Sequence, residues 1–339
     1  MPNGFDSEKY KASQKRALLK RARGRGKDRL YVEVGGKIID DNHATRVLPG
    51  YRKDLKLEVI NEVFPNAEIV CGVSAKDIDR GRERIDFGLS YDEEVFRLLD
   101  GLKARKQNID KVIITRLDMK KISKRVLDFE KAIIKRGFKV FRFPENPHYL
   151  PDEKMIPGLD ATPFIEFSAP EIIVTAPGAG SGKFGICLTQ LYHEMKRGGK
   201  PKYLKIETFP VHNMPINHPL NSAYVASCAD LGDQNIPDEN DADRAVSYNR
   251  DLENFKLLQF VASEFGHHAD HLRAYVSATS MGVNFIRDGI VDDDIIARES
   301  AAEIARRFMR HKQEYLSEKG KKETYLIMRR LMRDLADAA

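Results

Sequence analysis

The sequence has no tryptophan, only three cysteines and no long apolar run, and each shortage argues against a class of protein. Cys71, Cys187 and Cys228 are odd in number and widely spaced in apolar surroundings, which indicates buried thiols rather than a disulfide framework or a zinc site. No apolar stretch approaches the roughly 18 residues that span a bilayer, and the N-terminus lacks the apolar core of a secretory signal. We therefore expect a cytoplasmic protein without a membrane partner.

The sequence does hold 339 residues with a net charge of +6, and this charge is unevenly spread. Ten basic residues and one acidic residue lie between Lys9 and Arg29, so the rest of the chain is slightly acidic. This segment predicts a helix in which Tyr10 and Leu18 pack against the body while the charged face meets water. Nucleic-acid binding through the same charges is the alternative, and we favour it least.

The most informative stretch runs from Val174 to Phe184, a glycine-rich turn between a predicted strand and a predicted helix. Residues 171–175 are β-branched and flanked by prolines, which predicts a buried strand. Residues 184–196 carry apolar side chains at spacings of three and four, which predicts a helix. Unpaired N–H groups at a helix start attract anions, so the turn predicts a phosphate site. Its predicted ligands are Gly178, Gly180, Ser181, Gly182 and Lys183.

The turn departs from the P-loop pattern G-x-x-x-x-G-K-[ST] at two positions. Gly182 and Lys183 fit the pattern, but Pro177 stands at the first glycine position and Phe184 replaces the hydroxyl that normally holds magnesium. Ser181 or a remote carboxylate would then have to reach any metal ion. A glycine-rich turn with a solvated lysine and no ligand is the alternative interpretation.

Around this unit, predicted strands alternate with predicted helices of about ten to fifteen residues, which is typical of a doubly wound, mainly parallel Rossmann-like sheet. Further strands are predicted at 29–39, 67–75, 110–118, 138–143 and 203–209, and helices at 55–64, 93–106, 122–136 and 220–231. A mostly helical C-terminal region should follow, with helices at 248–265, 292–313 and 324–336. The fold class expected is therefore α/β with a variant P-loop-like unit.

The same pattern divides the chain into four regions. These are a basic N-terminal helix at 1–29, an α/β sheet region at 30–150, the glycine-loop unit with a His/Pro loop continuing the α/β core at 151–235, and a helical region at 236–339. The proline-rich segment 144–170 lacks periodicity and is interpreted as a connecting excursion or a lid.

Polar residues gather where the predicted strands end, and in a parallel sheet these ends share one edge. We expect the loops at 35–46, 80–92, 115–118, 178–183 and 212–221 to converge on one cleft. Further ligands of an anionic cofactor are predicted at Gly35, Gly36, Lys37, Arg46 and Arg116. Catalytic roles are predicted for Lys183, which would offset charge in the transition state, and for His43 or His218, which would transfer a proton. Glu207 and Asp230 are predicted to hold a metal ion.

Several ordered stretches together resemble an uncharacterised bacterial family, domain of unknown function 1846. The stretches are Gly4 to Asp6, Gly35 to Lys37, His43 to Gly50, Asp86 to Gly88, Tyr91-Asp92, Ile114 to Arg116, Thr175 to Lys183, Gln190 to Glu194, Glu207 to Pro210, His218 to Asn221, Tyr248 to Asp251 and Met281 to Asn284. The resemblance implies a cytoplasmic α/β protein with a helical portion that self-associates, and no settled activity. It also implies that members continue further, so a C-terminal α/β portion is expected to be absent here.

The leading functional hypothesis is an enzyme that binds a phosphorylated small molecule or nucleotide and transfers a phosphoryl group, with magnesium as the expected metal. The second hypothesis is a non-catalytic phosphometabolite sensor or homo-oligomeric scaffold that uses the same loop without turnover.

Overall fold

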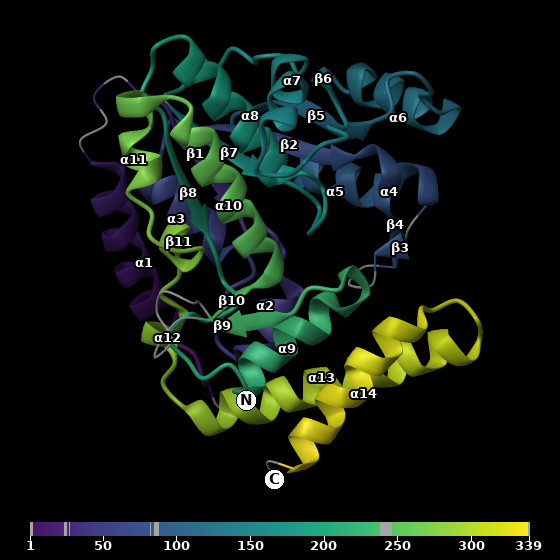
Figure 1. Cartoon of the computed structure of the whole chain (residues 1–339). Helices are drawn as coiled ribbons and strands as arrows, with labels where there is room; N and C mark the ends of the chain where they lie inside the picture. The colour runs from purple at the N-terminus through teal and green to yellow at the C-terminus, as the bar shows by residue number, and fades with distance from the viewer. Residues whose placement is uncertain are drawn as a thin grey trace.

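The computed structural model describes residues 3–23, 26, 28–81, 83–84, 88–237 and 246–337 (Figure 1). Seven strands form one parallel sheet in the order β11-β8-β1-β7-β2-β5-β6. Their bounds are β1 (Leu30–Val34), β2 (Glu68–Ser74), β5 (Ile109–Leu117), β6 (Lys139–Pro144), β7 (Glu171–Thr175), β8 (Lys202–Ile206) and β11 (Gly282–Val283). The predicted α/β class with a parallel sheet is confirmed.

The winding of the sheet reverses between β1 and β7. From β1 the chain passes to β2, β5 and β6 on one side, and from β7 it passes to β8 and β11 on the other side. Such a reversal leaves a crevice beyond the carboxyl ends of the two strands, where ligands of doubly wound sheets bind. The glycine-rich turn follows β7 directly, so the sequence delivers it to this crevice.

Helices cover both faces of the sheet, and the side chains of β1 alternate between the two resulting cores. Val32 packs into the core that holds α3 (Leu55–Val63), α5 (Tyr91–Ala104) and α6 (Lys124–Lys135), and α1 (Ser7–Ala22) packs beside α3 in the same core. Tyr31 packs into the opposite core, beneath α8 (Lys183–Lys196), α10 (Asn249–Ser263), α11 (Asp270–Arg273) and α7 (Ile156–Asp160). Both cores are therefore built on the same strands.

The local sequence explains the two elements that frame the glycine-rich turn. All five residues of β7 are buried, as the β-branched run predicts. The helix α8 buries most of its apolar side chains, among them Ile186, Leu188 and Leu191. It ends at Lys196, two residues before Gly198, whose φ of +83° suits glycine.

Two short helices lie in polar segments that follow strands of the sheet. The segment around Asp40 to Arg46 forms α2 (Asn42–Val47). The Asp41 carboxylate accepts a hydrogen bond of 3.1 Å from the Ala44 N–H and so caps this helix. The helix α4 (Ala75–Arg80) follows β2, and the strands β3 (Glu83–Arg84) and β4 (Leu89–Ser90) lead into α5.

The C-terminal part holds the short helix α12 (Ile286–Gly289), which was not predicted, and the long helices α13 (Asp293–Leu316) and α14 (Lys322–Asp337), which match the predicted helices at 292–313 and 324–336. The pair α13 and α14 forms a hairpin, yellow in Figure 1, that packs against α9 (Pro219–Cys228). The strands β9 (Asn235–Pro237) and β10 (Val246–Tyr248) pair antiparallel beside it, and the acidic residues between them lie outside the described residues. No helix in the described part of the chain is both long and apolar enough to cross a bilayer.

Candidate functional site

A cleft of about 1650 Å³ opens where the parallel strands end. It is lined by the segments that follow β1, β5, β6, β7 and β8, together with residues of α10 and of the α13–α14 hairpin. Pockets that hold drug-sized ligands are commonly roughly 300–1,000 Å³, so this cleft has room for a ligand with more than one functional part.

The glycine-rich turn forms one wall of the cleft, and its backbone requires glycine at two positions. Gly180 and Gly182 have φ values of +79° and +81°, a region that other residues rarely adopt. Gly182 is also packed against β5, because a Cβ there would lie 2.8 Å from the Thr115 hydroxyl oxygen. Gly182 precedes α8 and offers no side chain to cap it, so the first N–H groups of the helix lack a side-chain acceptor. A helix start of this kind is suited to an anion.

Ser181 holds this turn from within. Its hydroxyl lies 2.9 Å from the Tyr91 hydroxyl and donates to the Gly178 carbonyl at 3.1 Å. Its carbonyl accepts a hydrogen bond of 3.0 Å from the Thr115 hydroxyl. Since Ser181 is fully buried, these contacts commit its hydroxyl to the support of the loop and not to a metal ion.

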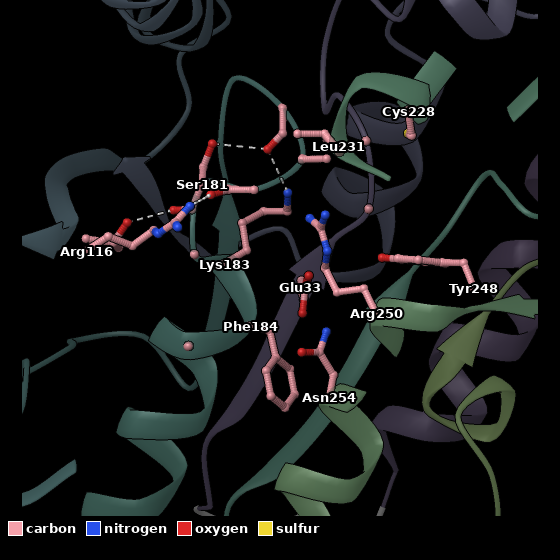
Figure 2. Close-up of a pocket in the computed structure, with 18 of the residues that line it drawn as sticks. Glu33, Arg116, Ser181, Lys183, Phe184, Cys228, Leu231, Tyr248, Arg250 and Asn254 are labelled. Atoms are coloured by element: carbon pink, nitrogen blue, oxygen red, sulfur yellow. Dashed lines mark hydrogen bonds between the residues drawn. The ribbon is translucent and has the colours of Figure 1, made fainter. Parts of the chain in front are cut away.

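Lys183 lies at the start of α8 with its ammonium in the cleft wall (Figure 2). Nζ donates a hydrogen bond of 3.2 Å to the Gly178 carbonyl in its own loop. Burial lowers the pKa of Lys183 to about 8; the Glu33 carboxylate opposes this shift, and the nearby cations of Lys205 and Arg250 add to it. An anion bound here would relieve the crowding of positive charge.

The cleft as a whole is rich in positive charge. Twelve lysines and arginines line it, against seven aspartates and glutamates. Arg250 extends from α10 towards Lys183 (Figure 2) and forms an ion pair of 2.7 Å with Asp233. A concave surface with an excess of one charge focuses its field and attracts ions of the opposite sign.

Most of the predicted anion ligands reach the cleft. Gly35, Gly36, Lys37 and Arg116 line it together with the turn 178–183. A guanidinium nitrogen of Arg116 lies 3.5 Å from the Gly180 carbonyl, and the Lys37 ammonium lies 3.4 Å from Glu94. From the predicted loop at 80–92, Arg80 lines the cleft. Arg82 and residues 85–87 of this loop lie outside the described residues.

Two predicted residues serve other contacts. The Arg46 guanidinium binds Glu303 of α13 at 3.0 Å and does not line the cleft. His218 precedes α9 and caps it, because Nδ1 accepts a hydrogen bond of 3.1 Å from the Leu220 N–H, while Nε2 lies 3.3 Å from Asp293. The expectation that loop 212–221 joins the cleft is therefore not met, since the prolines and this cap hold it against α9 and α13.

The predicted metal ligand Glu207 is part of a buried ion-pair network. Its oxygens lie 2.6 Å from the Lys205 ammonium and 3.0 Å from His212. Burial disfavours its charged form, but Lys205 and His212 outweigh that effect and lower the pKa of Glu207 to about 2. Lys205 also binds Asp251 at 2.5 Å and Tyr248 at 2.8 Å. Glu207 is thus fully engaged.

Asp230, the other predicted metal ligand, lines the cleft. Within the ranges that the structure describes, no three or more His, Cys, Asp or Glu side chains cluster as a metal site would require. A metal ion held here would therefore depend on oxygens of the ligand itself, as magnesium often does with phosphates.

His43 lines the cleft from α2 and is held by the C-terminal region. Its Nδ1 lies 3.4 Å from the Glu303 carboxylate of α13, and Arg307 donates to the same carboxylate at 2.7 Å. Burial lowers the pKa of His43; Glu303 opposes this shift, and Arg307 adds to it. Nε2 of His43 is buried and has no hydrogen-bond partner among the described residues.

Sequence reasoning missed several cleft residues. Glu33 is a buried charge within the apolar strand β1, and such a charge is a signal that could have marked it. Arg250 lies within the family stretch Tyr248 to Asp251, but that stretch does not indicate a place in the cleft. The α13 residues Arg307 and Arg310 carry no local signal, because they reach the cleft only through the packing of helices that are distant in sequence.

The fold and the cleft together define a doubly wound, Rossmann-like α/β protein with a cation-lined cleft at the switch point of its parallel sheet. The chain belongs to the family described as Domain of unknown function DUF1846, N-terminal, which matches residues 3–336. The resemblance inferred from the sequence motifs is confirmed.

Similar proteins carry the name UPF0371 protein, which states no activity. The chain is 40% identical over 342 residues to one from Clostridioides difficile (strain 630), covering 99% of this chain and 67% of the relative. It is 40% identical over 332 residues to one from Clostridium botulinum (strain Alaska E43 / Type E3), covering 96% and 64%, respectively. One from Fusobacterium nucleatum subsp. nucleatum is 41% identical over 317 residues, covering 91% and 61%. The chain thus spans about two thirds of the length of these relatives.

Proposed function

We propose that the cleft binds a phosphorylated small molecule or nucleotide with a phosphate at the glycine-rich turn, and that it catalyses phosphoryl transfer. The observation that carries the proposal is the start of α8, which has no side-chain cap. There Gly180 and Gly182 would let the backbone approach a phosphate closely, and Lys183 supplies a buried ammonium. Backbone N–H groups, a helix dipole and a cation at one point form a phosphate site.

In this mechanism the protein supplies positioning and charge. The Lys183 ammonium would exchange the Gly178 carbonyl, 3.2 Å away, for a phosphate oxygen. Lys183 and Arg250 would then offset the negative charge that develops on the transferred group. Glu207 is unsuited to hold magnesium because Lys205 and His212 occupy its oxygens. The Asp230 carboxylate lines the cleft, where an ion that the substrate phosphates carry could approach it.

A second candidate function is phosphate-ligand binding without turnover, as in a sensor or a self-associating scaffold. Phe184 favours it, because this residue stands where a P-loop places the hydroxyl that coordinates magnesium. The two functions differ in one observable. An enzyme releases or transfers phosphate from the bound compound, whereas a sensor saturates with it and leaves it intact.

The test is thermal unfolding and calorimetric titration with pyrophosphate, nucleoside phosphates and sugar phosphates, each with and without magnesium. A ligand at 100 times its dissociation constant stabilises the protein by about 2.7 kcal/mol. Lys183→Ala should lose most of this stabilisation. Lys131→Ala is the matched control, because it removes an exposed charge on α6 that does not line the cleft.

Full affinity in Lys183→Ala would place the phosphate elsewhere and refute the site. Where a compound binds, release of inorganic phosphate over time separates the enzyme from the sensor. Sedimentation at several protein concentrations measures the predicted self-association.

A further inference from the structure

Glu33 stands out among the cations of the cleft. It lies at the carboxyl end of β1 with 5% of its surface exposed, and Figure 2 shows it between Lys183 and Arg250. Its Oε2 accepts a hydrogen bond of 2.8 Å from the Tyr203 hydroxyl. In the described part of the chain, Tyr203 is the one residue that donates to this carboxylate, and no lysine or arginine there forms an ion pair with it. Oε1 is left without a donor from these residues.

Phosphate binding does not explain this carboxylate. A negative charge beside the glycine-rich turn repels a phosphate and weakens its binding. A structural counter-ion would contact a cation directly, and Glu33 contacts none of the described lysines and arginines although several line the same cleft. The group that Glu33 suits is a hydrogen-bond donor on the ligand.

His43 also lines the cleft and carries a second acceptor, Nε2, which is itself buried. The Glu303 carboxylate accepts from Arg46, Arg306 and Arg307 at 2.7–3.0 Å, and their charges hold it ionised. An ionised carboxylate can only accept, so the Nδ1–H of the neutral His43 ring donates to it and the lone pair of Nε2 remains. A buried acceptor without a partner is costly, and native proteins rarely leave one unused.

The two acceptors match one ligand chemistry. We propose that Glu33 and His43 accept hydrogen bonds from hydroxyl groups of the ligand, so that the cleft selects a phosphorylated polyol over inorganic polyphosphate. A sugar phosphate and the ribose of a nucleotide share this chemistry. This inference rests on the proposed function, which places the phosphate of the same ligand at the glycine-rich turn. The volume of about 1650 Å³ accommodates both parts.

The test compares pyrophosphate, which carries no carbon-bound hydroxyl, with ribose 5-phosphate, glucose 6-phosphate and ADP in calorimetric titrations at one pH and ionic strength. The native chain should bind at least one hydroxyl-bearing compound more tightly than pyrophosphate. Glu33→Gln removes the repelling charge while keeping the shape, so pyrophosphate affinity should rise several-fold. Affinity for the preferred hydroxyl compound should fall by about tenfold or more, the usual effect of losing a hydrogen bond to a charged group.

His43→Phe keeps the ring that packs at 5.3 Å on Phe209 and removes both nitrogens. It should leave pyrophosphate affinity unchanged and lower affinity for the hydroxyl compound by about tenfold. The two variants act on different elements, so a folding defect in one, seen by thermal unfolding without ligand, leaves the other as a test. If a variant loses or reverses the native preference for the hydroxyl compound over pyrophosphate, the proposal is supported. The compound that the native chain binds most tightly shows whether the ligand is a sugar phosphate or a nucleotide.

Two negative results have different meanings. If pyrophosphate binds and Lys183→Ala abolishes that binding, but Glu33→Gln and His43→Phe change both ligand classes equally, hydroxyl selection is refuted and the phosphate site stands. If no compound binds, or Lys183→Ala binds all of them as the native chain does, the phosphate site is refuted and hydroxyl selection with it.

Discussion

The Tyr91 hydroxyl lies 2.9 Å from the Ser181 hydroxyl, although ninety residues separate them in the sequence. The same tyrosine oxygen accepts a hydrogen bond of 2.9 Å from the backbone N–H of Ser74. One buried side chain thus joins the end of β2, the start of α5 and the glycine-rich turn. The conformation of the turn therefore depends on a residue from a distant segment of the chain.

Tyr91→Phe should destabilise the protein by about 1–3 kcal/mol, because it leaves the buried Ser74 N–H and Ser181 hydroxyl short of a partner. Pyrophosphate affinity should fall as well, since the turn loses its anchor. Urea unfolding and calorimetry measure the two effects. Tyr192→Phe is the matched control, because its hydroxyl donates to Asp160 at 2.7 Å outside the turn; it should change stability without changing affinity.

The two glycines of the turn should differ in their tolerance of alanine. Either substitution forces a left-handed residue, which costs about 1–2 kcal/mol. Gly182→Ala also brings Cβ to 2.8 Å from Thr115, whereas Cβ at Gly180 meets nothing closer than 3.9 Å. Urea unfolding should therefore show the larger loss for Gly182→Ala. Gly137→Ala, with a φ of +83° and open space around it, measures the backbone cost alone; equal losses at all three positions would contradict the prediction.

Anion affinity should depend on pH through Lys183. The pKa of this residue is about 8 in the free protein, and a bound anion favours the protonated form and raises it. Affinity should therefore be highest below pH 8 and fall by up to about tenfold per pH unit above it. Lys183→Arg stays protonated, so its titration reports only the ionisation of the probe. A native profile parallel to that of Lys183→Arg between pH 8 and 9 would rule out this role.

The ion pairs of Lys205 should matter for stability. Lys205→Met leaves Glu207 and Asp251 buried without their cation, which should cost about 3–5 kcal/mol in urea unfolding. Adding Asp251→Asn removes one of the two stranded charges and should restore part of this loss. If the double variant is no more stable than Lys205→Met, the buried Asp251 carboxylate does not contribute to the loss of stability in Lys205→Met.

The sequence predicted much of the fold because its patterns are local. The strand at 171–175 was placed at the bounds that β7 adopts, and the helix after it was placed within one residue of the start of α8. Local sequence patterns could not predict the order of the strands in the sheet, because the insertion of β7 between β1 and β2 depends on pairing between distant segments. The division into four regions stays a prediction.

The cleft was predictable only in part. The glycine-rich turn and Lys37 were found because motif and charge stand together in the sequence, and both line the cleft. His218 looked equally suited to chemistry, but the structure uses its ring to cap α9. Arg307 came from a helix more than a hundred residues after the turn, and only tertiary packing reveals such a contribution.

The place of β7 in the sheet also bears on how the chain is made. In sequence order β7 is the fifth strand of the sheet, yet it separates the first two, β1 and β2, which pair with it and not with each other. On a ribosome, β1 and β2 are therefore complete well before β7, the strand that joins them, which begins 97 residues after the end of β2. Until then each presents an open edge to other chains. The segment that completes the sheet is the same one that carries the glycine-rich turn, so the cleft cannot form before the sheet closes.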